Sequence, residues 1–200
     1  MTTTLPPRIS EQSLDQLFRQ ARTQNGWTSE TVPDSLLREI YDLAKMGPTS
    51  ANASPARFVF LTTPEAKERL RPSLAPMNVE KAMTAPVVVL VAHDLEFYEK
   101  LPKLLPHADM RSYFVGNDDL IEETAFRNSS LQGAYLILAA RALGLDAGAM
   151  SGFNAGAVDA EFFPDGKTKV NFIVTLGHGD ETKVFPRNPR LDFEEATTVL

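Results

Sequence analysis

The chain of 200 residues contains no cysteine. A disulfide framework, a thiolate metal site and a cysteine nucleophile are therefore excluded. Histidine is scarce as well, because only His93, His107 and His178 occur and they stand far apart. No HxxxH or HExxH pattern links them, so the spacing predicts no metal site.

Basic residues are not in excess either. Twenty Lys and Arg against 26 Asp and Glu give a formal net charge of −6. A nucleic-acid-binding protein is expected to present a basic face, so this balance argues against one, although it does not exclude local basic pockets.

Long apolar runs are also absent. The longest, residues 134–145, is interrupted by Arg141 and is too short to span a bilayer. The opening "MTTTLPPRIS" has neither the basic nor the apolar region of a secretory signal. We therefore expect a cytoplasmic protein without membrane contact.

Three common catalytic signatures are missing. The sequence contains neither the GxSxG of serine hydrolases nor the GxxxxGK[ST] of P-loop proteins. Gly177-His178-Gly179 is only half of a dinucleotide fingerprint, and no third glycine or helix follows it. A nucleotide-binding Rossmann unit is therefore not expected.

What is present is the composition of a globular protein. Hydrophobic residues make up 43% of the chain and charged residues 23%, and the 14 prolines and 11 glycines are scattered, without repeats or low-complexity blocks. This length fits one large domain or two small ones. We take residues 1–200 as one domain with a flexible N-terminus over residues 1–9.

Apolar periodicity and capping residues predict the secondary structure. The helices are expected over residues 10–22, 34–47, 63–70, 118–143 and 154–162. The strands are expected over residues 57–61, 86–92, 145–150 and 169–178. The run "PVVVLVA" lacks alternation, which indicates a strand buried on both faces of a sheet. The order of elements predicts a mixed α/β or α+β domain with a central sheet.

Three segments have features that predict their place in the fold. The second half of the longest helix, "GAYLILAARAL", is apolar on nearly every face, which indicates a helix at a core centre or between subunits. Residues 94–117, with Pro102 and Pro106, look irregular and are expected to form an excursion from the core. The tail, residues 180–200, has no strong period and is expected to wrap another surface.

The loop "GPTSANASPARF" is rich in small hydrogen-bonding residues, and arginines and carboxamides lie dispersed around it in the sequence. A planar phosphorylated cofactor requires arginines for its phosphate, and backbone amides and carboxamides for the polar edge of its ring. The residues that suggest such a site are Arg22, Thr23, Asn52, Asn78, Asn128, Arg187, Arg190 and the segment "MSGFN" at 150–154.

Each of these residues also has a purely structural interpretation. An arginine near a helix end can interact with the helix dipole in solvent. "GPTSAN" can be a helix stop followed by a second cap, and Asn128 can make polar contacts inside a long helix. The residues alone therefore leave a plain α/β domain and a cofactor-binding domain both open.

Longer motifs resemble the family of flavin-dependent nitroreductase-like proteins. "GPTSANASPARFVF" resembles that family's loop against the FMN ring. "APVVVLVA" and "ETAFRNSSLQGAYLILAARALGLDAGAMSGFN" resemble its core strand, dimer helix and flavin-edge loop. More closely, "SPARFVF", "FYEKLP", "PHADMRSYF" and "EETAFRNSSLQGAYLILA" resemble the malonic semialdehyde reductases of the Rut pyrimidine-degradation pathway. The resemblance extends from about Leu14 to the C-terminus.

This resemblance implies an α+β FMN-dependent nitroreductase fold, in which helices flank a central mixed or antiparallel sheet. It also implies an intertwined homodimer, with FMN at each interface between residues of both chains. Carried over to this sequence, the FMN-binding residues are Arg22, Thr23, Arg187 and Arg190 at the phosphate, Pro48, Thr49, Ser50, Asn52, Asn78 and Asn128 around the isoalloxazine, and Ser151 and Gly152 near N5.

The chain departs from the family pattern at three places. The usual arginine-rich "RRSxR" opening is reduced to "ARTQN", a glutamate before "GF" is replaced by Ser151, and a tryptophan after the loop's proline is replaced by Arg57 in "PAR". The last two changes point away from a generic reductase of aromatic nitro compounds.

The implied reaction is ping-pong hydride transfer from NAD(P)H through FMN to malonic semialdehyde, which becomes 3-hydroxypropionate. Arg57, Arg111 and Arg127 are candidates for binding the substrate carboxylate, with Arg111 on the excursion as a lid favoured. His107, Tyr113 or solvent would supply the proton. The alternatives are a broad nitro or quinone reductase on the same fold, and a flavin-binding store or redox sensor without turnover.

Overall fold

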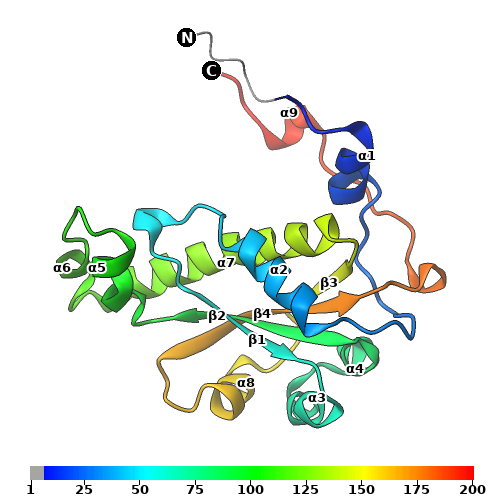
Figure 1. Ribbon diagram of the computed structural model, residues 1–200, viewed down its shortest axis with the longest axis horizontal. Coiled ribbons are helices and arrows are strands. Elements are labelled where there is room, and N and C mark those ends of the chain that lie inside the picture. The colour runs from blue at the N-terminus through cyan, green and yellow to red at the C-terminus, as the bar shows by residue number, and fades with distance from the viewer. Residues whose placement is uncertain (1–6) are drawn as a thin grey trace.

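The computed structural model describes residues 7–200, so most of the predicted flexible stretch 1–9 lies outside the described residues. Its centre is an antiparallel sheet in the order β1-β2-β4-β3 (Figure 1). The strands are β1 (Ala56–Leu61), β2 (Val87–Asp94), β3 (Asp146–Met150) and β4 (Thr168–Gly177). All four strands were predicted to within two residues of these bounds. β2 is buried from Val87 to His93, which confirms a strand covered on both faces.

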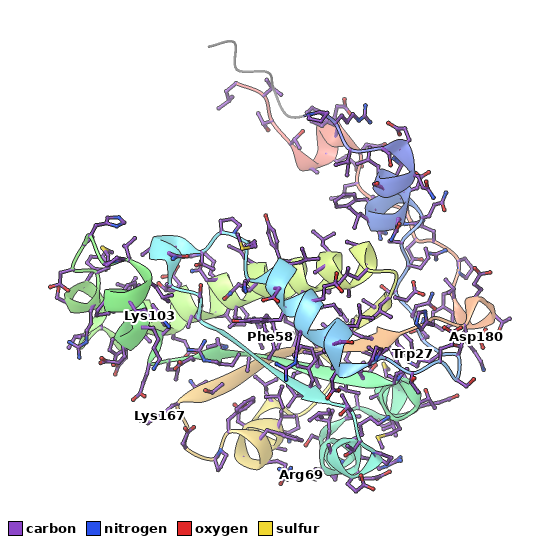
Figure 2. All side chains as sticks on the ribbon, in the orientation of Figure 1. Trp27, Phe58, Arg69, Lys103, Lys167 and Asp180 are labelled. Atoms are coloured by element: carbon purple, nitrogen blue, oxygen red, sulfur yellow. The ribbon has the colours of Figure 1, made fainter. Side chains whose placement is uncertain are left out.

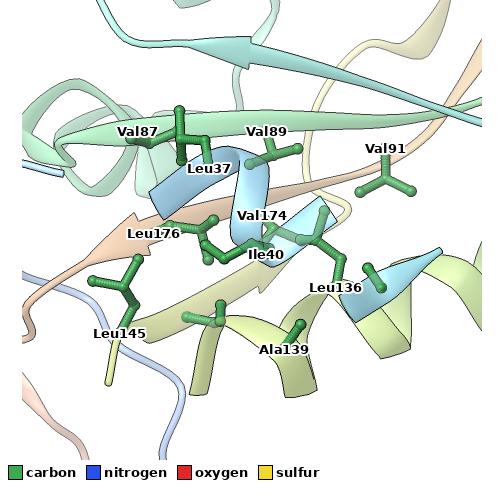
Figure 3. Close-up of a cluster of buried hydrophobic side chains, with 13 residues drawn as sticks. Leu37, Ile40, Val87, Val89, Val91, Leu136, Ala139, Leu145, Val174 and Leu176 are labelled. Carbon is green, nitrogen blue, oxygen red and sulfur yellow. The ribbon is translucent and has the colours of Figure 1, made fainter. Parts of the chain in front are cut away.

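Helices cover both faces of the sheet (Figure 1). α2 (Asp34–Ala44) and α7 (Asp118–Ala142) pack on one face, where Leu37 and Ile40 meet Val89 and Leu136 in a buried cluster (Figure 3). The other face is covered by α3 (Pro64–Leu70), α4 (Pro76–Thr84) and α8 (Ala155–Phe162). A sheet between helical layers with antiparallel strands is an α+β arrangement.

Capping residues set several helix ends as predicted. Thr63 Oγ1 accepts from the Ala66 amide at 3.2 Å, with Pro64 at the first helical position of α3. Asn154 Oδ1 accepts from the Ala157 amide at 3.1 Å at the start of α8. Gly144, with φ of 84°, ends α7 in the left-handed conformation that glycine tolerates.

The first two helices end earlier than predicted. α1 (Glu11–Leu14) continues as a π-helix, η1 (Asp15–Arg19), and stops before Arg22. Beyond it, Thr23 instead forms a bridge with Ala147 of β3, so tertiary pairing overrides the helical pattern. α2 ends at Ala44 and is followed by turns up to Gly47.

The second half of α7 is not buried on every side. Leu131 and Tyr135 keep 45% and 40% of their surface exposed. A core-centre position is therefore wrong for the single chain, and a position between subunits stays a prediction.

The excursion is ordered rather than irregular. It contains η4 (Phe97–Lys100), α5 (Leu101–Leu104) and α6 (Arg111–Phe114). Phe97 and Phe114 meet edge-on with ring centroids 4.9 Å apart, in a buried cluster with Ile121 of α7. This aromatic packing, which has no periodic signature in the sequence, gives the segment its structure. Its function as a lid stays a prediction.

The two ends of the described chain lie together beyond the sheet (Figure 1). α1 and η1 contain no buried residue, nor does α9 (Phe193–Ala196) near the C-terminus. Between β4 and α9 lies the short η5 (Glu181–Lys183), and η2 (Ser50–Asn52) and η3 (Arg71–Ser73) are similar single turns. No buried core within the described residues therefore anchors these terminal helices.

Candidate functional site

The predicted phosphate-binding residues surround one cavity of about 450 Å³. Arg22 and Thr23 reach it from the segment after η1, and Arg187 and Arg190 reach it from the tail. Arg141, in the last turn of α7, lines the same cavity and was not singled out as a site residue from the sequence. The fold thus gathers four guanidinium groups that are dispersed over the sequence.

These arginines bond to backbone carbonyls. Arg187 Nη2 donates to the carbonyls of Arg19 at 2.7 Å and Ala21 at 3.0 Å, and Arg22 donates to that of Phe185. Within residues 7–200, none of the four cavity arginines forms an ion pair with a carboxylate. Their charge is therefore not neutralised locally, and the cavity favours an anion.

A second cavity, of about 480 Å³, shares Asn25 and Phe185 with the first. Asn78 lines it from α4 and donates from Nδ2 to the Gly152 carbonyl at 2.9 Å. A Cβ added at Gly152 would lie 2.7 Å from Asn78 Nδ2, so only glycine permits this approach. Ser151 precedes it directly after β3, so Asn78, Ser151 and Gly152 form one group.

Lys81 belongs to this second cavity and was missed by the sequence analysis. It is only 7% exposed, and burial lowers the pKa of its ammonium group. Its backbone carbonyl accepts at 3.0 Å from Nε1 of Trp27, a residue that is labelled in Figure 2. Lys81 follows Asn78 by three residues on α4, so both side chains share one helix face. That spacing was the signal available in the sequence.

Gln24 is a second polar group that the sequence analysis missed. It is 5% exposed, and its buried Oε1 has no hydrogen-bond partner among the described residues. Buried carboxamide oxygens are normally paired, so this one is available to a donor on a ligand or to water.

The loop that carries Pro48, Thr49, Ser50 and Asn52 has a strained backbone. Ala51, Asn52 and Ser54 have φ of 51°, 52° and 44°, a region that non-glycine residues rarely adopt. Each such residue costs about 1 to 3 kcal/mol, and it persists where neighbouring groups enforce it.

Two carboxamides of α7 enforce this loop. Asn128 Oδ1 accepts from the Ser50 amide at 2.7 Å, and Gln132 Oε1 accepts from the Ala56 amide at 2.8 Å. Within the loop, Thr49 Oγ1 accepts from the Ser54 amide at 3.1 Å. The loop is therefore fixed before any ligand binds.

Two predicted ring contacts have other partners in the chain. Asn128 is fully buried and also donates to the Thr124 carbonyl at 2.8 Å, so it supports the loop instead of facing a ligand. Asn52 Nδ2 donates to the Leu104 carbonyl at 2.8 Å, which links the loop to the excursion. Leu104 lies 52 residues from Asn52, so the sequence gave no sign of that contact, whereas the bond from Asn128 to Thr124 is the contact inside a long helix that the structural interpretation of Asn128 allowed.

The arginines predicted to bind a substrate carboxylate are already paired. Arg57 forms an ion pair with Asp94 and donates to the Ala56 carbonyl at 2.8 Å. Arg111 donates two hydrogen bonds to Glu99, at 2.8 Å and 2.7 Å, and these hold the pKa of that carboxyl below its ordinary value.

Arg127 pairs with Glu123 on the surface of α7. The two predicted proton donors lie on the excursion: His107 lines a cavity of about 370 Å³ together with Arg111, and Tyr113 is 62% exposed.

The site residues thus fall into two separate groups. Asn128, beside the loop, and Arg141, in the arginine cavity, are 13 residues apart on α7, or about 20 Å along the helix axis. α4, with Asn78, lies across the sheet from α2 and α7 (Figure 1). The loop lines none of the cavities that contain Asn78 or Arg22.

No cluster of three or more His, Asp or Glu side chains placed to hold a metal ion occurs in residues 7–200. Over the same residues, no helix combines the length and apolarity needed to cross a bilayer.

The sequence pattern of the nitroreductase family matches residues 7–178. The chain therefore belongs to the nitroreductase family. A protein of Burkholderia lata provisionally named NADH dehydrogenase/NAD(P)H nitroreductase is 60% identical over 191 residues, which cover 96% of this chain and 98% of the relative. A protein of the same provisional name from Rhodopseudomonas palustris is 60% identical over 200 residues, the full length of both.

Solved structures show the same fold at low sequence identity. A nitroreductase-type protein from Exiguobacterium sibiricum, solved with FMN, superposes with a TM-score of 0.85 at 18% identity, over 98% of this chain and all of the other. The enone reductase CLA-ER, from gut-bacterial fatty acid metabolism, gives a TM-score of 0.83 at 20% identity, over 96% of this chain and all of the other. The nitroreductase α+β fold predicted from the sequence is confirmed.

Proposed function

We propose that the protein is an FMN-dependent NAD(P)H oxidoreductase. The observation that carries this proposal is the arginine cavity, where four guanidinium groups without carboxylate partners adjoin a second cavity that contains Asn78 and Lys81. The first cavity suits a phosphate, and the second suits the polar edge of a flat ring. Family membership and the FMN-bound structural relative support the same cofactor.

Different residues of the chain would bind different parts of FMN. Arg22, Arg187 and Arg190 would hold the phosphate, and Thr23 lies beside them. Asn78, Ser151 and Gly152 would border the ring, with Lys81 placing a positive charge beside Asn78. When bound, FMN supplies the hydride transfer between NAD(P)H and an acceptor, while the protein supplies binding, orientation and electrostatics.

The loop of residues 48–52 would cover the ring from a second subunit. Its separation from the arginine cavity within one chain supports this arrangement, as does the exposed apolar face of α7 with Leu131 and Tyr135. The terminal tail would then wrap the partner. We propose an intertwined homodimer with FMN at each interface, in the cytoplasm.

For the acceptor, the first candidate is malonic semialdehyde, which would be reduced to 3-hydroxypropionate. The support is the resemblance of "FYEKLP", "PHADMRSYF" and the "PAR" of the loop to the reductases of that aldehyde. The second candidate is a broad range of nitro or quinone acceptors. It is favoured by one structural observation, namely that Arg57, Arg111 and Arg127 are all paired with carboxylates, which leaves none of the three free for a substrate carboxylate.

Anaerobic reduction and reoxidation test both levels of the proposal. NADH or NADPH should bleach the visible band of bound FMN, and addition of the acceptor should restore it. Restoration by malonic semialdehyde supports the first candidate, whereas restoration by a nitroarene or quinone alone supports the second. If neither nicotinamide bleaches the flavin, the oxidoreductase proposal fails and a flavin-binding module without turnover stands instead.

A further inference from the structure

Arg141 has no role so far among the residues described at the arginine cavity. It extends from the last turn of α7, is half-buried, and donates from Nη1 to the Leu17 carbonyl of η1 at 3.1 Å. Its own carbonyl accepts from Gln16 Nε2 at 2.7 Å. Arg141 therefore joins the end of α7 to the N-terminal segment at the wall of the cavity.

The other cavity arginines also join separate segments. Arg187 of the tail bonds to the carbonyls of Arg19 and Ala21, and Arg22 bonds to that of Phe185 in the tail. The end of α7, the N-terminal segment 15–22 and the tail segment 185–190 thus meet at this cavity. Arginine bonds to backbone carbonyls connect them.

Few apolar contacts support this junction. Phe18 is 54% exposed and Phe185 is 72% exposed. Segments without buried side chains open at a low free energy unless other contacts hold them. Arg141 and Gln16 therefore link residues 15–22 to the end of α7, while Arg22 and Arg187 link those residues to the tail.

The junction also carries an electrostatic cost. Burial lowers the pKa of the Arg141 guanidinium, and the charge of Arg187 acts in the same direction, while Asp146 opposes both. A phosphate monoester carries a charge of about −1.5 to −2 at neutral pH, enough to offset much of this repulsion.

We propose that Arg141 is a fourth phosphate-binding residue, and that the phosphate end of the cofactor fixes both terminal segments to the end of α7. This inference rests on the proposed binding of FMN and adds a residue and a conformational consequence to it. Binding of the phosphate and docking of the terminal segments are then coupled, so each favours the other.

Because of this coupling, FMN should dock the terminal segments and riboflavin, which has the same ring without the phosphate, should not. FMN should protect residues 15–22 and 185–190 of the wild-type protein from amide hydrogen exchange, and riboflavin should not. The variant Arg141→Met keeps an apolar stem and removes the charge. It should weaken FMN by about tenfold, a typical loss for one charge-assisted hydrogen bond, and leave riboflavin unchanged.

Two further variants serve as controls for Arg141→Met. Arg141→Lys keeps the positive charge and should recover part of the FMN affinity. Arg38→Met removes an exposed arginine of α2 outside the cavity and should bind both flavins as the wild type does. Equal weakening of FMN and riboflavin in Arg141→Met, or unchanged FMN affinity, would overturn the inference and leave the proposed function standing.

Binding of inorganic phosphate tests the role of Arg141 separately from the binding of FMN. If the wild-type protein binds neither flavin, the proposed function fails. The inference about the cavity is then tested by the rise in Tm on addition of inorganic phosphate. A rise that is lost in Arg141→Met supports it, and no rise overturns it.

Discussion

At the scale of single residues, two populations of arginine differ in their partners. Those of the surface and the excursion, such as Arg57, Arg71 and Arg111, form ion pairs with carboxylates. Those of the cavity, such as Arg141 and Arg187, bond to backbone carbonyls and have no such pair within residues 7–200. An overall charge of −6 therefore coexists with a strongly positive pocket. The arginines without carboxylate partners around one cavity identify the candidate site, which the overall composition does not.

Two variants can show whether Arg57 binds the substrate or supports the loop. Because Arg57 ties the loop carbonyls of Ser54 and Ala56 to Asp94, we expect Arg57→Met and Asp94→Asn to weaken FMN to a similar extent, by a few-fold to tenfold. Fluorescence titration of the apoprotein measures this. If Arg57 bound the substrate carboxylate instead, Arg57→Met alone would raise KM for malonic semialdehyde at unchanged FMN affinity.

His93 predicts a pH dependence of stability. It is 2% exposed, and burial lowers the pKa of its imidazole, although Glu122 opposes this through a hydrogen bond and its charge, as does Asp159 more weakly. Lys169 adds to the lowering. The unfolded histidine, with a pKa of about 6.5, then binds more protons than the folded one, so the free energy of unfolding falls as pH drops through that value.

Urea unfolding between about pH 7 and pH 5 measures the effect. His93→Gln should reduce the slope of stability against pH. An unchanged slope in His93→Gln would show that other groups determine the acid sensitivity.

At the scale of elements, α7 holds the loop of residues 48–52 through Asn128 and the start of β1 through Gln132. Asn128→Ala would leave the Ser50 amide without its partner and should cost about 1 to 3 kcal/mol of stability. It should also weaken FMN, because the strained loop would relax. Urea unfolding and flavin titration check the two effects.

Asn171→Ala is the matched control for that prediction. Asn171 donates to Ser129 and Ser130 of α7, at 2.9 Å each, and does not touch the loop. It should lose stability without losing FMN affinity. Parallel losses of FMN affinity in both variants would contradict a specific link between Asn128 and the loop.

The exposed face of α7 makes a separate prediction about assembly. In a twofold dimer, Leu131→Lys would bring its charge into the interface twice, once from each subunit. We expect sedimentation to show a shift toward monomer, with FMN affinity falling in step. Val115→Lys, on the excursion and 50% exposed, is the control that should stay dimeric. A Leu131→Lys protein that remains dimeric would exclude this face of α7 as the interface.

At the scale of the whole molecule, the features that the sequence predicted correctly are those set by local chemistry. A β-branched run identified β2, and Thr63 and Asn154 identified helix starts because their caps act over three residues. The expectation that residues 94–117 are irregular was wrong, because the contact between Phe97 and Phe114 that orders them joins residues 17 positions apart.

For the site residues too, the sequence predicted what depends on local pattern and missed what depends on tertiary packing. Arg22, Arg187 and Arg190 were expected together, and the structure places them around one cavity. Lys81 was missed, since a single lysine in a helix normally faces solvent and only tertiary packing buries it. The bond from Asn52 to Leu104 depends on how the excursion folds back, which no local pattern specifies.

Two variants combined in one dimer test whether the flavin site is composed of two subunits. One variant carries Arg187→Glu in the arginine cavity, and another carries Ser50→Trp at an exposed position of the loop. Each alone should form a dimer that binds no FMN. In a mixed dimer of the two, one interface would combine the intact cavity of one chain with the intact loop of the other.

Flavin content of the purified mixed dimer is therefore the most direct measurement. A site shared between subunits predicts one FMN per mixed dimer. A site built within a single chain predicts none, and that result would exclude a flavin site shared between subunits.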